Sequence, residues 1–207
     1  MRAASPGEAA MESVRRKVLL HTCCGPCSLA VVEALRGRGH EVLGFFYNPN
    51  IHPFAEFERR RQAMAQAAEA IGLPMIWRDD YGLVEFLRRV VFHERERCPL
   101  CYGMRLEMAA RAAAFEGCDA FTSTLLISPY QDQAALREIG ERAAESAGVR
   151  FLGDDFRRLF REGHHRARES GLYCQNYCGC IYSEMEAAAQ RKKRAGRGRA
   201  SPSMGEE

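Results

Sequence analysis

Short apolar runs alternate with amphipathic segments along the first part of the chain, and no other feature of the sequence restricts the fold as strongly. Three of the runs are typical of buried strands: KVLLHT (17–22), EVLGFFY (41–47) and PMIW (74–77). A strand-helix-strand order of this kind predicts a parallel sheet with right-handed crossovers. We therefore expect an α/β fold, with one Rossmann-like domain and a central parallel sheet flanked by helices.

The first helix is expected to begin with Ser28 as its N-cap and to end near Gly37 and Gly39. Two further strands are expected at 119–126 and 149–153. The other predicted helices cover 54–72, about 83–92, from near Pro99 to 117, and about 131–147, and the remainder is expected to be helical apart from a cysteine-containing loop at 174–180.

One domain, spanning 17–189, is expected for these 207 residues, because the sequence has neither an internal repeat nor a clear linker. Residues 1–16 lack the apolar core of a signal peptide and are expected to be disordered. Residues 190–207 contain six Lys or Arg and two Glu, which predicts a disordered basic arm that either contacts nucleic acid or is only a solvated tail. No run is long enough for a transmembrane helix, so we expect a cytoplasmic protein without a membrane partner.

Nine cysteines are many for this length, and eight of them fall into three clusters. Thiols stay reduced in the cytosol, so clustered cysteines there indicate metal or redox chemistry more than structural disulfides. Cys118 stands alone between a predicted helix and a predicted strand, and it is expected to be a packing residue. The clusters are Cys23, Cys24 and Cys27; Cys98 and Cys101; and Cys174, Cys178 and Cys180.

Cys-x2-Cys pairs that lie far apart in the sequence indicate a four-thiolate site, and both zinc and a [4Fe-4S] cluster accept such ligands. Adjacent Cys23 and Cys24 are a poor match to one small tetrahedral ion, which favours iron–sulfur without excluding zinc. In the third cluster, Cys178-Gly-Cys180 brings two thiols close enough for an easily reduced disulfide. A second metal site that includes Cys174 is the alternative.

Three loops follow predicted strands or overlap their ends: HTCCGPCS, YNPNIHP and STLLISPYQD. The carboxyl ends of parallel strands share one edge of a sheet, and ligands gather there. We therefore expect these loops to meet at one site.

Five blocks of the sequence closely resemble the epoxyqueuosine reductase family of the QueH type: LLHTCCGPCS, GFFYNPNIHPFAEFERR, RCPLCYGMRLEMAA, FTSTLLISPYQD and GLYCQNYCGCIYS. The resemblance runs from about residue 17 to about residue 185. It implies a sheet like that of PP-loop nucleotide alpha-hydrolase proteins. It also implies reduction of the epoxide of epoxyqueuosine to queuosine, at the wobble position of tRNA, with a [4Fe-4S] cluster.

Carried onto this chain, the resemblance implies that Cys23, Cys24, Cys98 and Cys101 bind the cluster and that Cys178 and Cys180 are the redox-active pair. An additional mononuclear iron is an open expectation. Its candidate ligands are Cys174, Asp132 and Cys27.

Epoxide reduction requires two electrons and two protons. The dinucleotide-binding pattern Gly-x-Gly-x-x-Gly is absent from the sequence, so we expect electrons from an external donor. Candidate proton donors are Asp132, Tyr130 and His21, although each is also explained as a structural hydrogen-bonding residue.

A wobble base is reached in a single-stranded anticodon loop, where aromatic and amide side chains can stack on it or hydrogen-bond to it. Candidates for these contacts are Tyr47, Asn48, Asn50, Tyr102 and Tyr130, with Arg59 and Arg105 for phosphates. Ordinary core aromatics and solvated arginines are the alternative interpretation. Rival functions are a structural zinc protein that binds nucleic acid, a thioredoxin-type oxidoreductase, and an iron–sulfur enzyme of another tRNA modification, such as sulfur transfer.

Overall fold

The computed structural model describes residues 15–198, with the side chains described as far as residue 195. Its centre is a five-stranded sheet in the order β3-β2-β1-β4-β5, with every pair of neighbouring strands parallel. This arrangement confirms the predicted Rossmann-like α/β fold. The strands are β1 (Lys17–Thr22), β2 (Glu41–Tyr47), β3 (Met75–Arg78), β4 (Ala120–Ser123) and β5 (Arg150–Phe151).

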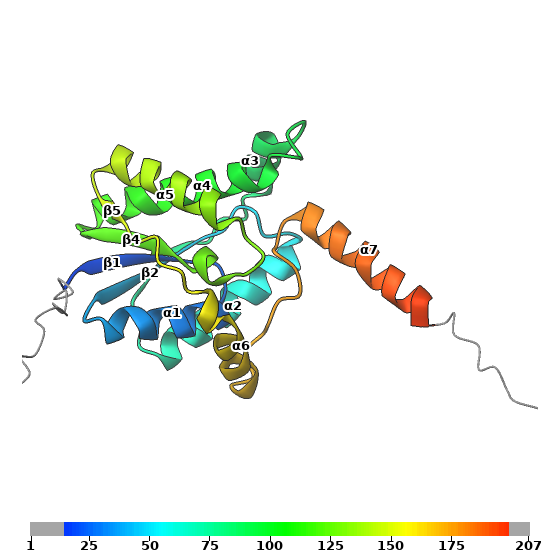
Figure 1. Cartoon of the computed structure of the whole chain (residues 1–207), viewed down its shortest axis with the longest axis horizontal. Helices are drawn as coiled ribbons and strands as arrows, with labels where there is room; N and C mark the ends of the chain where they lie inside the picture. Colours follow the sequence, from blue (N-terminus) through cyan, green and yellow to red (C-terminus); the bar gives the residue numbers. More distant parts are fainter. Residues whose placement is uncertain (1–14, 199–207) are drawn as a thin grey trace, which may run out of the picture.

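Helices cover both faces of the sheet (Figure 1). One layer contains α1 (Gly25–Gly37), α2 (Phe54–Ala70) and α6 (Phe160–Glu169). The other contains α3 (Leu83–Val90), α4 (Arg97–Phe115) and α5 (Gln133–Ala147). Two short 3-10 helices, η1 (Thr124–Ile127) and η2 (Arg157–Leu159), follow β4 and precede α6. The last helix, α7 (Ile181–Gly198), projects away from the body.

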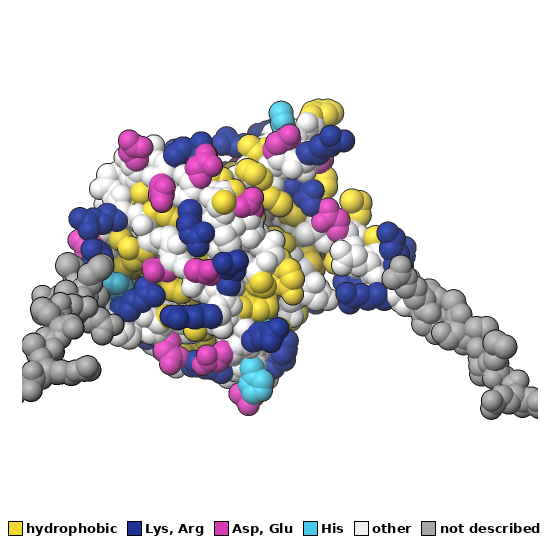
Figure 2. Space-filling view, in the orientation of Figure 1, with side chains coloured by type: hydrophobic (Ala, Val, Ile, Leu, Met, Phe, Trp, Pro, Cys, Tyr) yellow, Lys and Arg dark blue, Asp and Glu magenta, His cyan; other side chains and the backbone are white. Residues whose placement is uncertain are grey.

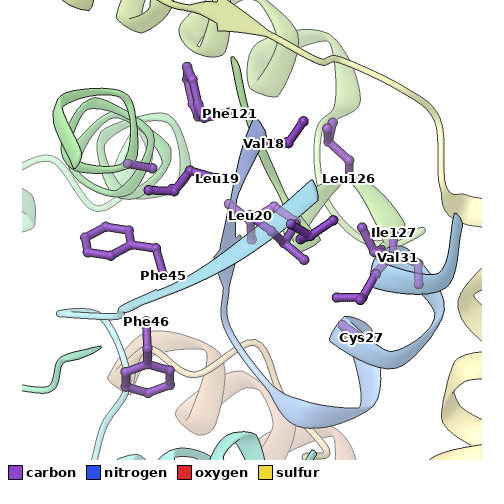
Figure 3. Close-up of a cluster of buried hydrophobic side chains, with 14 of the residues drawn as sticks. Val18, Leu19, Leu20, Cys27, Val31, Phe45, Phe46, Phe121, Leu126 and Ile127 are labelled. Carbon is purple, nitrogen blue, oxygen red and sulfur yellow. The ribbon is translucent and has the colours of Figure 1, made fainter. Parts of the chain in front are cut away.

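The core lies on both faces of β1 and β2. Leu19 and Leu20 are fully buried, and Figure 3 shows Leu19 on the side of Phe45 and Leu20 on the side of Val31 of α1. Phe45 and Phe46 point to opposite sides of β2 (Figure 3). A strand that is buried on both faces needs a continuous apolar run, which explains why these segments do not alternate with polar residues.

Two predicted boundaries beside the candidate site were wrong. Helix α1 begins at Gly25, with Cys24 at the N-cap position, because Pro26 fits the first helical turn. Ser28 lies inside the helix and donates its hydroxyl to the Cys24 carbonyl at 2.9 Å. The strand predicted at 119–126 ends at Ser123, whose Oγ accepts from the Leu125 amide and begins η1.

The expected disordered tail was also wrong in part, since α7 continues through residues 190–198. Ala187 to Gln190 and the Arg and Lys residues after them favour helix intrinsically. The disorder expected of residues 1–14 and 199–207 lies outside the described residues. Within residues 15–198, no helix has both the length and the hydropathy to cross a membrane.

The start of α1 packs closely against α2, and adding a methyl group at Gly25 tests this packing. A Cβ at Gly25 would lie 2.6 Å from the backbone oxygen of Ala63, so Gly25→Ala should lower the free energy of unfolding by about 1–3 kcal/mol. Gly37, at the other end of α1, has open space, and Gly37→Ala should be neutral or gain about 0.4–1 kcal/mol. Urea unfolding measures both variants, and equal stabilities would contradict the close approach.

Candidate metal and redox centre

The first cysteine loop, residues 21–28, lies at the end of β1, where the connections on the two sides of the sheet separate to opposite faces. β1 pairs with both β2 and β4, and the helices that follow β1 and β4 cover opposite faces. The Cys23 amide donates to Thr124 Oγ1 at 3.1 Å, and this hydroxyl also lies 3.3 Å from Cys23 Sγ. The carboxyl ends of two adjacent strands therefore hold Cys23 at the usual ligand-binding position of such a sheet.

The sulfurs of Cys23, Cys24 and Cys27 lie within 4.8 Å of one another, and those of Cys23 and Cys24 are 4.0 Å apart. Tetrahedral zinc with bonds of about 2.3 Å would separate its sulfurs by about 3.8 Å. The trio thus has the spacing of metal ligands. This spacing suits one ion as well as neighbouring irons, so the adjacent cysteines do not disfavour zinc as the sequence predicted.

The trio is also electrostatically suited to a cation. Hydrogen bonds from Cys24 and Cys27 hold the pKa of Cys23 well below its usual range, with help from the Arg105 charge and the Thr124 hydroxyl. The contact with Cys23, followed by burial, raises the pKa of Cys24 to about 12, and that of Cys27 is raised by its two thiol neighbours. Ionisation is thus favoured at Cys23 over its two neighbours, and a bound cation would favour ionisation of all three.

The second cluster lies in the first turns of α4. Cys98 is exposed, whereas Cys101 is buried in a small apolar cluster with Cys180 and Phe86. Burial raises the pKa of Cys101 to about 12, and the neighbouring Arg105 charge opposes this shift.

Arg105 connects the cysteine segments from inside the protein. It is 2% exposed, and its guanidinium contacts Asn48 Oδ1 at 2.9 Å, His21 Nε2 at 3.4 Å and Cys101 Sγ at 4.0 Å. No carboxylate pairs with it in the described part of the chain. A buried cation without a carboxylate needs another source of negative charge, and thiolates around a metal group would supply it. The guanidinium is enclosed and contacts sulfur, and its predicted contact with RNA phosphates stays a prediction.

The third cysteine segment, residues 174–180, lies against the other two. Gln175 Nε2 lies 3.0 Å from Cys24 Sγ, and Gln131 Nε2 lies 3.8 Å from Cys178 Sγ. All the cysteines are free thiols in this structure, including Cys178 and Cys180. Sequence reasoning missed Gln175, Gln131 and Thr124. The signal available was their position, because Gln175 lies in a cysteine loop, and Thr124 and Gln131 lie in the connection that follows β4.

A buried ion pair holds the backbone of this segment. Arg60 Nε donates to Glu56 Oε1 at 2.8 Å, while Nη1 and Nη2 donate to the carbonyls of Cys178 and Tyr177 at 2.8 and 2.9 Å. Gly179 has a φ of +135°, and a Cβ there would lie 3.1 Å from Arg60 Nη1. Glycine is therefore required between the two cysteines for steric as well as conformational reasons.

The three candidate proton donors differ in placement. His21 is fully buried between Ser123 Oγ at 2.8 Å and the Tyr47 carbonyl at 3.1 Å. Burial, then the Arg105 charge, lower its pKa to about 3, so it is neutral at neutral pH. Asp132 caps α5 by accepting from the amides of Ala134 and Ala135. Tyr130 is 82% exposed.

The residues predicted to contact the base are mostly inside the protein. Tyr47 donates its hydroxyl to Glu85 at 2.9 Å, and Tyr102 donates to Gln131 at 2.8 Å. Asn48 donates to the Thr22 carbonyl at 2.9 Å. Asn50 is buried, and its Oδ1 has no hydrogen-bond partner among the described residues. All four residues are buried, and their contact with a base stays a prediction.

Comparison with known proteins points to one family. The family model for epoxyqueuosine reductase QueH matches residues 18–186, a range that contains all nine cysteines. Epoxyqueuosine reductase QueH of Dehalococcoides mccartyi is 37% identical over 82% of this chain and 93% of that protein. The proteins of the same name from Thermotoga maritima and Haemophilus influenzae are 34% and 36% identical, each over 86% of this chain and over 94% and 75% of their own lengths.

Removing Arg60 should loosen the third cysteine segment. Arg60→Met leaves the buried Glu56 carboxylate with the exposed Arg59, at 3.1 Å, and the Tyr173 hydroxyl, and we expect the free energy of unfolding to fall by about 1.5–3 kcal/mol. In the double variant Glu56→Gln/Arg60→Met both charges are gone, so its loss should be smaller than that of Arg60→Met alone. Chemical denaturation measures the three proteins. A double variant less stable than the single one would refute the ion-pair account.

Proposed function

Because the chain belongs to the epoxyqueuosine reductase QueH family, we propose that it reduces the epoxide of epoxyqueuosine at the wobble position of tRNA, with a [4Fe-4S] cluster as its cofactor. Membership makes it an oxidoreductase of queuosine modification. A tRNA substrate and reduced thiols are consistent with work in the cytoplasm.

Cys23, Cys24, Cys98 and Cys101 would hold the cluster. The observation that supports this assignment best is the buried, carboxylate-free Arg105, which contacts Cys101 and whose charge acts on Cys23. When bound, the cluster supplies single electrons. Of the candidates for an additional iron ligand, Cys27 has the strongest support, because its sulfur already lies with Cys23 and Cys24.

The reaction consumes two electrons and two protons. Both C–O bonds of the epoxide break, a C=C bond forms, and the oxygen leaves as water. Cys178 and Cys180 can supply the electron pair by forming a disulfide, which an external donor must then reduce. Arg60 fixes the backbone of these thiols, and Gln131 contacts Cys178. Both protons end on the oxygen, and they are the two that the thiols release on forming the disulfide; Asp132 or Tyr130 would pass them on, because His21 is enclosed by Ser123 and the Tyr47 carbonyl.

The ligand assignment can be tested by metal content. In protein purified anaerobically, we expect Cys23→Ser, Cys24→Ser, Cys98→Ser and Cys101→Ser each to lose most of the bound iron and sulfide. Cys118→Ala is the control, because Cys118 is buried just before the start of β4, at the edge of the sheet opposite the carboxyl ends of the strands, and it should keep the parent's content. Full iron in the four variants, or zinc in the parent protein, would reject the assignment.

The role of the third cluster can be tested by turnover. With tRNA carrying epoxyqueuosine and a chemical reductant, the parent should yield queuosine, detected by mass spectrometry of the nucleosides. Cys178→Ser and Cys180→Ser should keep their iron but lose turnover by at least tenfold. If both variants turn over at the parent rate, the redox pair is not part of the reaction.

A further inference from the structure

Helix α7 begins directly after Cys180 and is held at its root beside the second cysteine cluster. Arg97, the residue before Cys98, lies over the ring of Tyr182 at 5.7 Å and pairs with Glu186 at 2.5 Å. These contacts fix the first two turns of α7 to the start of α4. The direction of the helix is therefore set relative to both Cys98 and Cys180.

Beyond these turns the helix leaves the body and becomes strongly basic (Figures 1 and 2). Four consecutive basic residues, Arg191, Lys192, Lys193 and Arg194, are exposed. Successive residues of an α-helix are about 100° apart, so the four charges surround the helix instead of forming one stripe. A membrane-surface helix needs an apolar face opposite its charges, and residues 189–195 provide no such face.

The basic end lies at a useful distance from the reactive cysteines. Arg191 and Arg194 follow Ile181 by ten and thirteen residues, which corresponds to about 15–20 Å along the helix. Phosphates along a stacked strand recur about every 3.4 Å, so this reach corresponds to roughly five nucleotides. A nucleotide at the cysteines would then place the stem that flanks an anticodon loop beside the basic end.

We propose that the basic end of α7, residues 191–194, binds backbone phosphates of the tRNA stem that flanks the modified nucleotide. This inference rests on the proposed function, which supplies the RNA. Phosphate contacts of this kind carry no sequence information, but they fix the position and register of the RNA. The first two turns of α7 are fixed to the start of α4. RNA held at the basic end is therefore also positioned relative to Cys180 and Cys98. α7 is then a positioning element for the substrate, built next to the reaction site.

The test uses the full chain and a fluorescein-labelled anticodon stem-loop RNA, with binding followed by anisotropy over a range of salt concentrations. The variant Arg191→Gln/Lys192→Gln/Lys193→Gln/Arg194→Gln removes four charges and keeps helix-forming residues. The matched control is Arg15→Gln/Arg150→Gln/Arg158→Gln/Arg161→Gln, which removes four exposed charges from other elements. Circular dichroism of all three proteins checks that their helix content is the same.

We expect the α7 variant to bind at least tenfold more weakly at low salt. The slope of log affinity against log salt should fall in magnitude by about 3. Each lost phosphate contact lowers the magnitude of this slope by roughly 0.7–0.9, and four charges are removed. The control should keep the parent's affinity and slope. Equal effects in the two variants, or no effect in the α7 variant, would overturn the proposal and leave the reductase assignment intact. A parent chain that fails to bind the RNA would count against both, and metal content and turnover would then show whether the reductase assignment also fails.

Discussion

Parallel pairing of β1 with both β2 and β4 is the constraint on which the rest of the structure depends. It directs the following helices to opposite faces, so the loops after two adjacent strands meet at one edge of the sheet. Cys23 and Thr124 meet there. The start of α4 and the loop before α7 are linked to that edge by Arg105, which contacts Cys101, and by Gln175, which contacts Cys24.

Two buried arginines then give the site its charge and its rigidity. Arg60 is paired with Glu56, and its other two nitrogens donate to backbone carbonyls. Its effect is to fix the backbone of the third cysteine segment. Arg105 has no such carboxylate in the described residues and faces sulfur. Burying a guanidinium is costly unless negative charge accompanies it. Its placement therefore makes physical sense when the surrounding thiols are ionised, as they would be around a metal group.

The sequence predicts the sheet well and the details of the site less well. Apolar runs and strand-helix alternation are local patterns, so they identify the five parallel strands and the edge at which the cysteines lie. Arg60 and Arg105 look like any charged residues on amphipathic helices, and only packing shows that they are buried. The start of α1 was misplaced because Ser28 is a good cap, whereas Pro26 allows an earlier turn. The helical part of the basic tail was missed because charge and glycine suggested disorder.

The most direct test is anomalous diffraction from anaerobically grown crystals, measured at the iron and zinc absorption edges. The account predicts an iron-edge peak within bonding distance of the sulfurs of Cys23, Cys24, Cys98 and Cys101, beside the Arg105 guanidinium. A zinc-edge peak at that position, or iron bound away from these four sulfurs, would contradict it.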